Sequence, residues 1–92
     1  MHLECGGKSP HIFLRDLPDL DAAVACAAHG IFDNAGQICS AGSRLLVDRP
    51  ILDAFIDRFC AYTRRSFVPG DPLDLETTLG PLASAPQRER VL

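Results

Sequence analysis

Residues 11–32 read HIFLRDLPDLDAAVACAAHGIF, and this stretch decides the fold. Its first four residues, 11–14, form a short apolar run that is typical of a buried strand. The acidic side chains of Asp19 and Asp21 then favour a helix N-terminus, where the helix dipole attracts negative charge. From Leu20 to about Phe32 the apolar residues recur at helical spacing and define one face of a helix: Leu20, Val24, Ala27, Ala28 and Ile31.

A second strand and a second helix are predicted after a loop. The run Asn34-Ala-Gly36 ends the first helix, and the apolar run RLLV at 44–47 is again typical of a buried strand. Pro50 stands where a helix begins, because proline is tolerated in the first helical turn. We expect this helix to run to about Phe67, with an apolar stripe made of Ile51, Leu52, Phe55, Ile56 and Phe59.

The remaining residues are predicted to be mostly loop. The segment VPGDP at 68–72 is a strong helix breaker, and residues 68–82 carry no periodic pattern. Ser84 is a suitable N-cap for a final helix over residues 85–92.

The order strand, helix, strand, helix indicates an α/β fold with a parallel layer and a right-handed crossover. Two strands do not form a stable sheet in water, and buried-type strands require helices on both faces. Residues 1–92 are therefore expected to form a partial parallel βαβα layer that is incomplete as a domain.

Composition excludes several classes of protein. The chain has 92 residues, 47% of them hydrophobic, and a net charge of -3, so no basic footprint for nucleic acid is present. No apolar run approaches the ~20 residues of a membrane span, and no signal-peptide pattern precedes the first strand. We therefore expect a cytoplasmic protein without nucleic-acid or membrane partners.

The four cysteines are expected to be reduced. Cys5, Cys26, Cys39 and Cys60 include no C-x-x-C pair, which argues against a zinc site, and no signal sequence supports a disulfide framework. Cys26 and Cys60 lie in helix-like stretches and are expected to act as small buried hydrophobic residues. Cys39 differs from them because it lies in a turn-rich segment among small residues.

The run GGKS at 6–9 invites a comparison with a phosphate-binding loop. That loop requires a glycine five positions before Gly7, where this chain has His2, and also a strand before it and a helix after it. Too few residues precede the run for a strand, and Pro10 is unfavourable for a helix that is starting. The sequence therefore argues against a phosphate loop.

Cys39 and Glu4 are the candidate catalytic residues. A cysteine nucleophile reacts as a thiolate, and the small residues that follow Cys39 allow a substrate to approach closely. The backbone N–H of Cys39 is a candidate to hold an oxyanion. Glu4 precedes a Gly-Gly pair, and a carboxylate there is a candidate general base. One strand and one helix separate the two, so they could converge at the same end of a parallel layer.

Two motifs identify a resemblance. LECGGKSP at 3–10 resembles the glutamate motif of the NAD(P)-dependent aldehyde dehydrogenase family, and FDNAGQICSAGSR at 32–44 resembles its cysteine motif. The resemblance continues through DAAVACAAHGIF, RLLV, ILDAFIDRF and GDPLDLETTLGPLASAPQRERVL, and so covers essentially the whole chain.

The resemblance implies specific roles. Cys39 would attack the aldehyde carbon, and Glu4 would activate the water that releases a carboxylic acid from a thioester. Gly6 and Gly7 would leave room near the nicotinamide of NAD or NADP, while Lys8 and Arg44 would be structural. No metal is implied.

The resemblance also implies what lies outside these residues. Family members are several times longer, so residues 1–92 would be part of the catalytic domain and the dinucleotide-binding domain would be absent. The isolated chain is then expected to be inactive, and a full-length protein to be a homo-oligomer.

Two other functions remain open. The chain could be a non-catalytic remnant that acts by packing its apolar stripes on a partner subunit. It could also be a papain-like hydrolase that pairs Cys39 with His11 or His29, although the local signature of that class around the cysteine is missing.

Overall fold

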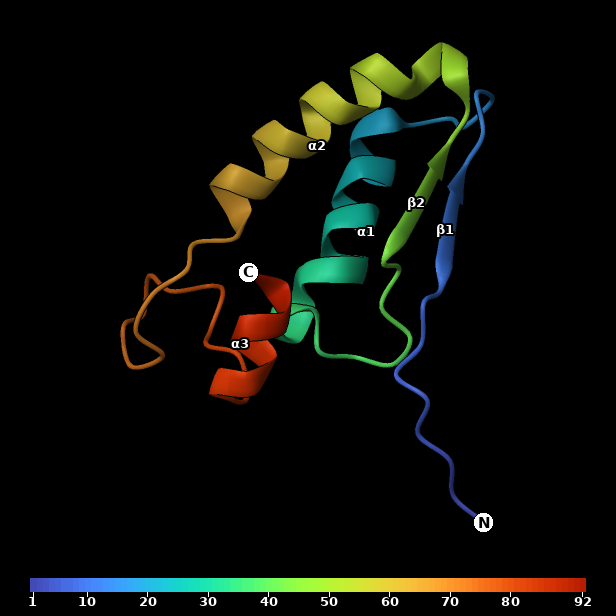
Figure 1. The fold of residues 1–92 in the computed structure, drawn as a ribbon. Helices are drawn as coiled ribbons and strands as arrows, with labels where there is room; N and C mark the ends of the chain where they lie inside the picture. Colours follow the sequence, from blue (N-terminus) through green and yellow to red (C-terminus); the bar gives the residue numbers. More distant parts are fainter.

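The computed structural model describes residues 1–92 and confirms the partial parallel layer. Strand β1 (Pro10–Phe13) pairs in parallel with strand β2 (Arg44–Val47), in a register that sets Pro10 opposite Arg44 and Phe13 opposite Val47. Helix α1 (Leu20–Phe32) connects the two strands, and helix α2 (Leu52–Ser66) follows β2; both helices lie on one side of the strand pair (Figure 1).

Helix α1 begins and ends where the sequence predicts. Its N-cap is Asp19, whose carboxylate accepts hydrogen bonds from the N–H groups of Asp21 at 2.9 Å and Ala22 at 3.0 Å. These bonds satisfy donors that have no partner inside the helix. The helix buries Val24, Ala27 and Ala28, all of which belong to the predicted face.

The core lies between α1, α2 and the strands. Phe55 of α2 is only 1% exposed and packs on Phe13 of β1, with their ring centroids 4.8 Å apart. Val24 and Ala27 of α1 complete this cluster. A 3₁₀ turn, Arg49–Ile51, carries Pro50 into α2, as the position of the proline predicts.

Three predictions of burial are wrong. Ile56 was expected on the apolar stripe of α2 but is 48% exposed, because it lies one residue, about 100° of helix rotation, beyond Phe55. Cys26 and Cys60 were expected to be buried but are exposed. Each belongs to a helix whose core-facing side is already occupied by larger or better-placed residues, such as Val24 and Phe55.

Strand β1 is displaced by one residue from the predicted run. It begins at Pro10 and ends at Phe13, whereas the prediction covered residues 11–14. Leu14 lies outside the strand because its carbonyl oxygen accepts a hydrogen bond from the Leu17 N–H at 3.3 Å, which starts the turn toward α1.

The face of the sheet that lies away from the helices is apolar and open. Ile12, Leu14 and Leu46 are 60%, 59% and 52% exposed. Together with their neighbours they line an open, mostly apolar hollow of about 470 Å³. Strands of buried type with one uncovered face agree with the prediction that this layer is incomplete as a domain.

Residues 68–82 form an ordered loop that ends at the last helix. An isolated bridge joins Pro69 to Leu79, and the Thr78 hydroxyl donates to the Ser66 carbonyl oxygen at 2.7 Å. Helix α3 (Ala85–Val91) then starts from the predicted N-cap, Ser84. None of the helices has the length and apolar character needed to cross a membrane.

An ion pair closes the strand pair at the end where both strands stop. Arg15 donates from Nε and Nη2 to the two carboxylate oxygens of Asp48, at 2.6 and 3.3 Å. The hydrogen bond from the Arg15 guanidinium, assisted by its positive charge, lowers the pKa of Asp48 below the ordinary value of 3.8.

We predict that Asp19→Ala destabilises the fold by about 1 kcal/mol, because it removes the acceptor of two N-terminal N–H groups of α1. Urea unfolding followed by circular dichroism measures this loss. Asp16→Ala is the control, since Asp16 is also exposed and acidic but makes no hydrogen bond to another residue. Equal unfolding midpoints for the two variants would contradict the capping role.

We predict that the effect of Arg15→Gln on stability depends on pH. Because the folded-state pKa of Asp48 is lowered, its contribution is complete above the unfolded value of about 3.9 and is lost as pH falls through the folded value. The difference in urea midpoint between wild type and variant should therefore be constant above about pH 5 and shrink below about pH 4. Arg64→Gln, which removes a charge outside any ion pair, should show no such change.

Candidate functional site

The glutamate segment, residues 1–9, approaches the strand pair from the end where both strands begin (Figure 1). Gly6 and Gly7 both have left-handed backbones, with φ of 74° and 54°, which L side chains rarely adopt. This turn brings the Gly6 N–H to within 2.9 Å of Oε1 of Glu4. Oε2 of Glu4 accepts no hydrogen bond from the protein.

The base of this segment is attached to strand β2. Arg44 donates from Nε to the Lys8 carbonyl oxygen at 2.9 Å, and its backbone N–H donates to the Ser9 carbonyl oxygen at 3.4 Å. The Lys8 ammonium donates to the Gly7 carbonyl oxygen at 2.9 Å. Arg44 therefore attaches the backbone of the segment to β2, whereas the bond of Lys8 stays within the segment.

Cys39 lies in an irregular turn between α1 and β2. Asn34, Ala35 and Gly36 have φ of 52°, 55° and 72°, so the chain leaves α1 through three left-handed residues in succession. The turn is tied back to the helix by the Gly42 N–H, which donates to the Gly30 carbonyl oxygen at 2.9 Å. The Cys39 side chain is exposed.

The two segments touch at Gly7. A Cβ atom placed on Gly7 would overlap the carbonyl oxygen of Cys39, so only glycine permits this approach. Glu4 and Cys39 consequently line one open hollow of about 530 Å³. Its other lining residues come from the same two segments and from the start of α3: Gly6, Lys8, Gly36, Gln37, Ile38, Ala83, Ser84 and Gln87.

The hollow contains the groups that acyl chemistry requires. It offers an exposed thiol, a carboxylate and the backbone N–H of Cys39, which donates to no acceptor within the protein. An N–H that is free of internal partners can donate to an oxygen that becomes negatively charged beside the thiol.

The sequence did not single out the third wall of the hollow. Gln37 accepts a hydrogen bond from the Ala83 N–H at 2.8 Å, across 46 positions of sequence. Gln37 lies within the cysteine motif, but nothing in the pattern of residues 68–82 predicts that Ala83, Ser84 and Gln87 return to this place.

Neither histidine joins Cys39. His29 contacts Oδ1 of Asp33 at 3.0 Å through Nδ1 and the Tyr62 hydroxyl at 3.1 Å through Nε2. The His11 ring packs on Phe13, with centroids 4.4 Å apart. Since neither imidazole lines the hollow, the pairing of a papain-like hydrolase is wrong for this chain.

The GGKS run is not a phosphate loop, as predicted. It leads into strand β1 at Pro10, whereas a phosphate loop leads into a helix. No group of three or more histidine, cysteine or acidic side chains is placed to hold a metal ion.

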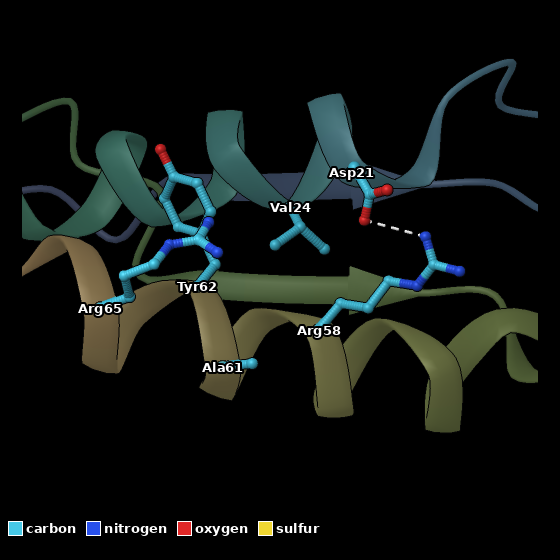
Figure 2. A pocket seen from close by; sticks show the side chains of 6 residues that line it. All are labelled: Asp21, Val24, Arg58, Ala61, Tyr62 and Arg65. Carbon is cyan, nitrogen blue, oxygen red and sulfur yellow. Dashed lines mark hydrogen bonds and ion pairs between the residues drawn. The ribbon is translucent and has the colours of Figure 1, made fainter.

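A third hollow, besides those on the sheet face and at Cys39, lies between α1 and α2 (Figure 2). Its volume is about 430 Å³, and Asp21 and Arg58 form an ion pair of 2.8 Å across it. The Arg65 guanidinium lies 5.4 Å from the centroid of the Tyr62 ring. It holds neither a thiol nor a predicted site residue, so the Cys39 hollow is the candidate site.

Comparisons with known proteins agree on one family. The sequence profile described as the aldehyde dehydrogenase family matches residues 1–92. The chain is 44% identical over 92 residues to aldehyde dehydrogenase [NAD(P)+] 2 of Saccharomyces cerevisiae, which covers 97% of the chain and 18% of that protein. It is 46% identical over 90 residues to betaine aldehyde dehydrogenase of Brucella ovis, and this match covers 98% of the chain and 18% of that protein.

Solved structures give the same result. The gamma-glutamyl-gamma-aminobutyraldehyde dehydrogenase of Burkholderia cenocepacia superposes with a TM-score of 0.87 and 53% identity, covering 94% of the chain and 17% of that protein. An indole-3-acetaldehyde dehydrogenase solved with NAD+ gives a TM-score of 0.87 and 45% identity, and this match covers 96% of the chain and 18% of that protein. The chain thus spans less than a fifth of the length of the relatives that it matches.

We predict that Gly7→Ala detaches the glutamate segment from the cysteine turn, because its Cβ has no space beside the Cys39 carbonyl. Gly6→Ala is a matched control: Gly6 also has a positive φ, but no atom lies within 4 Å of the added Cβ. Trypsin cleavage after Lys8, followed by mass spectrometry, should be at least about tenfold faster in Gly7→Ala than in Gly6→Ala, equivalent to about 1.4 kcal/mol. Equal cleavage rates would show that the contact does not hold the segment.

Proposed function

The chain belongs to the aldehyde dehydrogenase family, and from this premise we propose that it carries the nucleophile and the general base of an NAD(P)-dependent oxidation of aldehydes to carboxylic acids. One observation carries the proposal: Glu4 and Cys39, from separate motifs, line a single hollow because Gly7 packs directly on the Cys39 carbonyl.

Cys39 is the nucleophile in this proposal. Its exposed thiol is open to a small carbonyl compound that enters the hollow. The thiol loses its proton, Sγ bonds to the aldehyde carbon as the carbonyl π electrons move to oxygen, and that oxygen then takes up a proton to give a thiohemiacetal. The aldehyde oxygen gains negative charge in this step. The unpaired Cys39 N–H supplies one donor to that oxygen without first breaking a bond within the protein.

The residues at the rim are compatible with a flat cofactor ring. A Cβ built on Gly6 meets no atom within 4 Å, so the backbone there is open, and Gly6 and Gly7 would leave room for a nicotinamide. When bound, NAD(P) supplies the two-electron acceptor that turns the thiohemiacetal into a thioester. The GGKS run does not provide a phosphate loop, because it leads into a strand.

Glu4 is the general base in the second half of the reaction. Its Oε1 is held by the Gly6 N–H, while Oε2 has no partner in the protein and can accept a proton from water. The resulting hydroxide adds to the thioester carbon. The carbon–sulfur bond then breaks and the carboxylic acid leaves, and the proton held by Glu4 returns to Sγ, which restores the Cys39 thiol and the Glu4 carboxylate.

A second function is that of a non-catalytic remnant that packs on a partner subunit. The apolar stripes of α1 and α2, which were expected to be its interaction surface, instead pack on each other in the core through Val24, Ala27 and Phe55, so the uncovered sheet face would take that role. Ile12, Leu14 and Leu46 form the surface that such a partner would cover. In that case the substitutions of Cys39 and Glu4 described below change no activity, whereas Leu46→Lys weakens binding to the partner.

We predict that Cys39→Ala lowers turnover by roughly 10⁴-fold or more in the protein as the cell makes it, because no other thiol lines the hollow. Glu4→Gln should slow deacylation by roughly 10²- to 10⁴-fold and let an acyl-enzyme accumulate. Steady-state formation of NAD(P)H measures turnover, and intact-mass spectrometry detects the acyl group on Cys39. Cys26→Ala, on the outer side of α1, is the control; full activity of Cys39→Ala would overturn the proposed function.

A further inference from the structure

Gln37 makes the only hydrogen bond between the cysteine turn and the wall of the hollow formed by the start of α3. Its Oε1 accepts from the Ala83 N–H at 2.8 Å. Its Nε2 donates to the Asn34 carbonyl oxygen at 3.3 Å, while the Asn34 side chain donates back to the Gln37 carbonyl oxygen at 3.2 Å. One side chain thus joins the strained turn, the thiol-bearing loop and a remote segment.

The turn before Cys39 requires such support. An L residue in the left-handed region costs roughly 1–2 kcal/mol, and Asn34 and Ala35 both occupy it. Asn34 tolerates this conformation because its amide can form local hydrogen bonds, but Ala35 has no polar side chain with which to compensate. The paired amides of Asn34 and Gln37 hold a conformation that the backbone alone disfavours.

Cys39 itself makes no hydrogen bond within the protein, although Gly7 packs on its carbonyl oxygen. Its N–H donates to nothing in the protein, and its side chain is exposed. Backbone bonds hold the loop around it: the Ala41 N–H donates to the Ile38 carbonyl oxygen at 3.0 Å, and the Gly42 N–H donates to the Gly30 carbonyl oxygen at 2.9 Å. Within residues 37–43, Gln37 is the residue whose side chain forms hydrogen bonds to the rest of the protein.

The other end of the bond sets the width of the hollow. Ala83 is followed by Ser84, whose hydroxyl caps α3 by accepting from the Gln87 N–H at 3.3 Å. Both Ser84 and Gln87 line the hollow opposite Glu4 and Cys39. Figure 1 shows α3 near the C-terminal end of α1, where this bond holds it against the cysteine turn.

We propose that Gln37 is a positioning residue for Cys39: its amide clamps the cysteine turn to Ala83 and so fixes the thiol relative to the general base and to the α3 wall of the hollow. This inference rests on the proposed function and assigns to it a residue that acts through Cys39. Reaction rates depend steeply on such placement, since a shift of about 1 Å can cost about 10²-fold.

Two substitutions test the clamp. Gln37→Met keeps the length of the side chain but removes both hydrogen bonds, whereas Gln37→Glu keeps an oxygen that can accept from the Ala83 N–H. We expect Gln37→Met to lower kcat by about 10- to 100-fold, with the KM for the aldehyde changed by less than about threefold. The kcat of Gln37→Glu should be about tenfold higher than that of Gln37→Met.

Arg58→Met is the matched control, because it also removes a long-range side-chain hydrogen bond, of 2.8 Å to Asp21, but on the far side of α1. It should leave kcat within about threefold of wild type. Rates are normalised to the folded fraction of each variant, measured by circular dichroism, so that a loss of folded protein does not count as a loss of kcat.

The outcomes separate this inference from the proposed function. A wild-type kcat in Gln37→Met, or equal losses of kcat in Gln37→Met and Gln37→Glu, overturns the clamp. If Cys39→Ala is inactive in the same assay, the role of Cys39 as nucleophile is upheld. Turnover by Cys39→Ala overturns the proposed function itself. If Gln37→Met does not fold, Gln37→Glu decides alone: it must retain kcat within about tenfold of wild type, and a larger loss overturns the clamp.

Discussion

Parallel pairing of β1 and β2 is the constraint on which the candidate site depends. The glutamate segment runs directly into β1, and the cysteine turn runs directly into β2. Because parallel strands begin at the same edge of a sheet, the segments that precede them must meet there. An antiparallel pair would place the two motifs at opposite ends. The contact between Gly7 and the Cys39 carbonyl therefore follows from topology, and the absence of a Cβ at Gly7 makes it close.

The scaffold around this constraint is built on one side only. Phe55 and Val24, each 1% exposed, anchor the helices to the inner face of the sheet, while Ile12 and Leu46 on the outer face stay more than half exposed. Relatives that match the whole chain are more than five times longer, since it covers 17–18% of them. The uncovered apolar face and the small share of each relative's length that the chain covers both indicate one layer of a larger domain.

Local signals explain what the sequence predicts well. Helix α1 begins after the Asp19 cap and ends before the left-handed residues that start at Asn34, so both of its predicted ends are correct. The run RLLV forms β2 as predicted. Burial is predicted less well, because exposure of Cys26, Ile56 and Cys60 depends on which neighbours cover each helix face and not on periodicity. The bond from Gln37 to Ala83 has no sequence signal at all, since an irregular loop separates the two partners.

The proposed roles of Cys39 and Glu4 create an electrostatic conflict that the local backbone moderates. A thiolate and a carboxylate in one hollow repel each other, at about 1 kcal/mol for charges 4 Å apart in water and more where water is excluded. The Gly6 N–H offsets part of this repulsion by donating to Oε1 of Glu4, and the Lys8 ammonium adds a positive charge at the rim. Glycine at position 6 thus has two roles: its N–H donates to the carboxylate, and its missing side chain keeps the rim open.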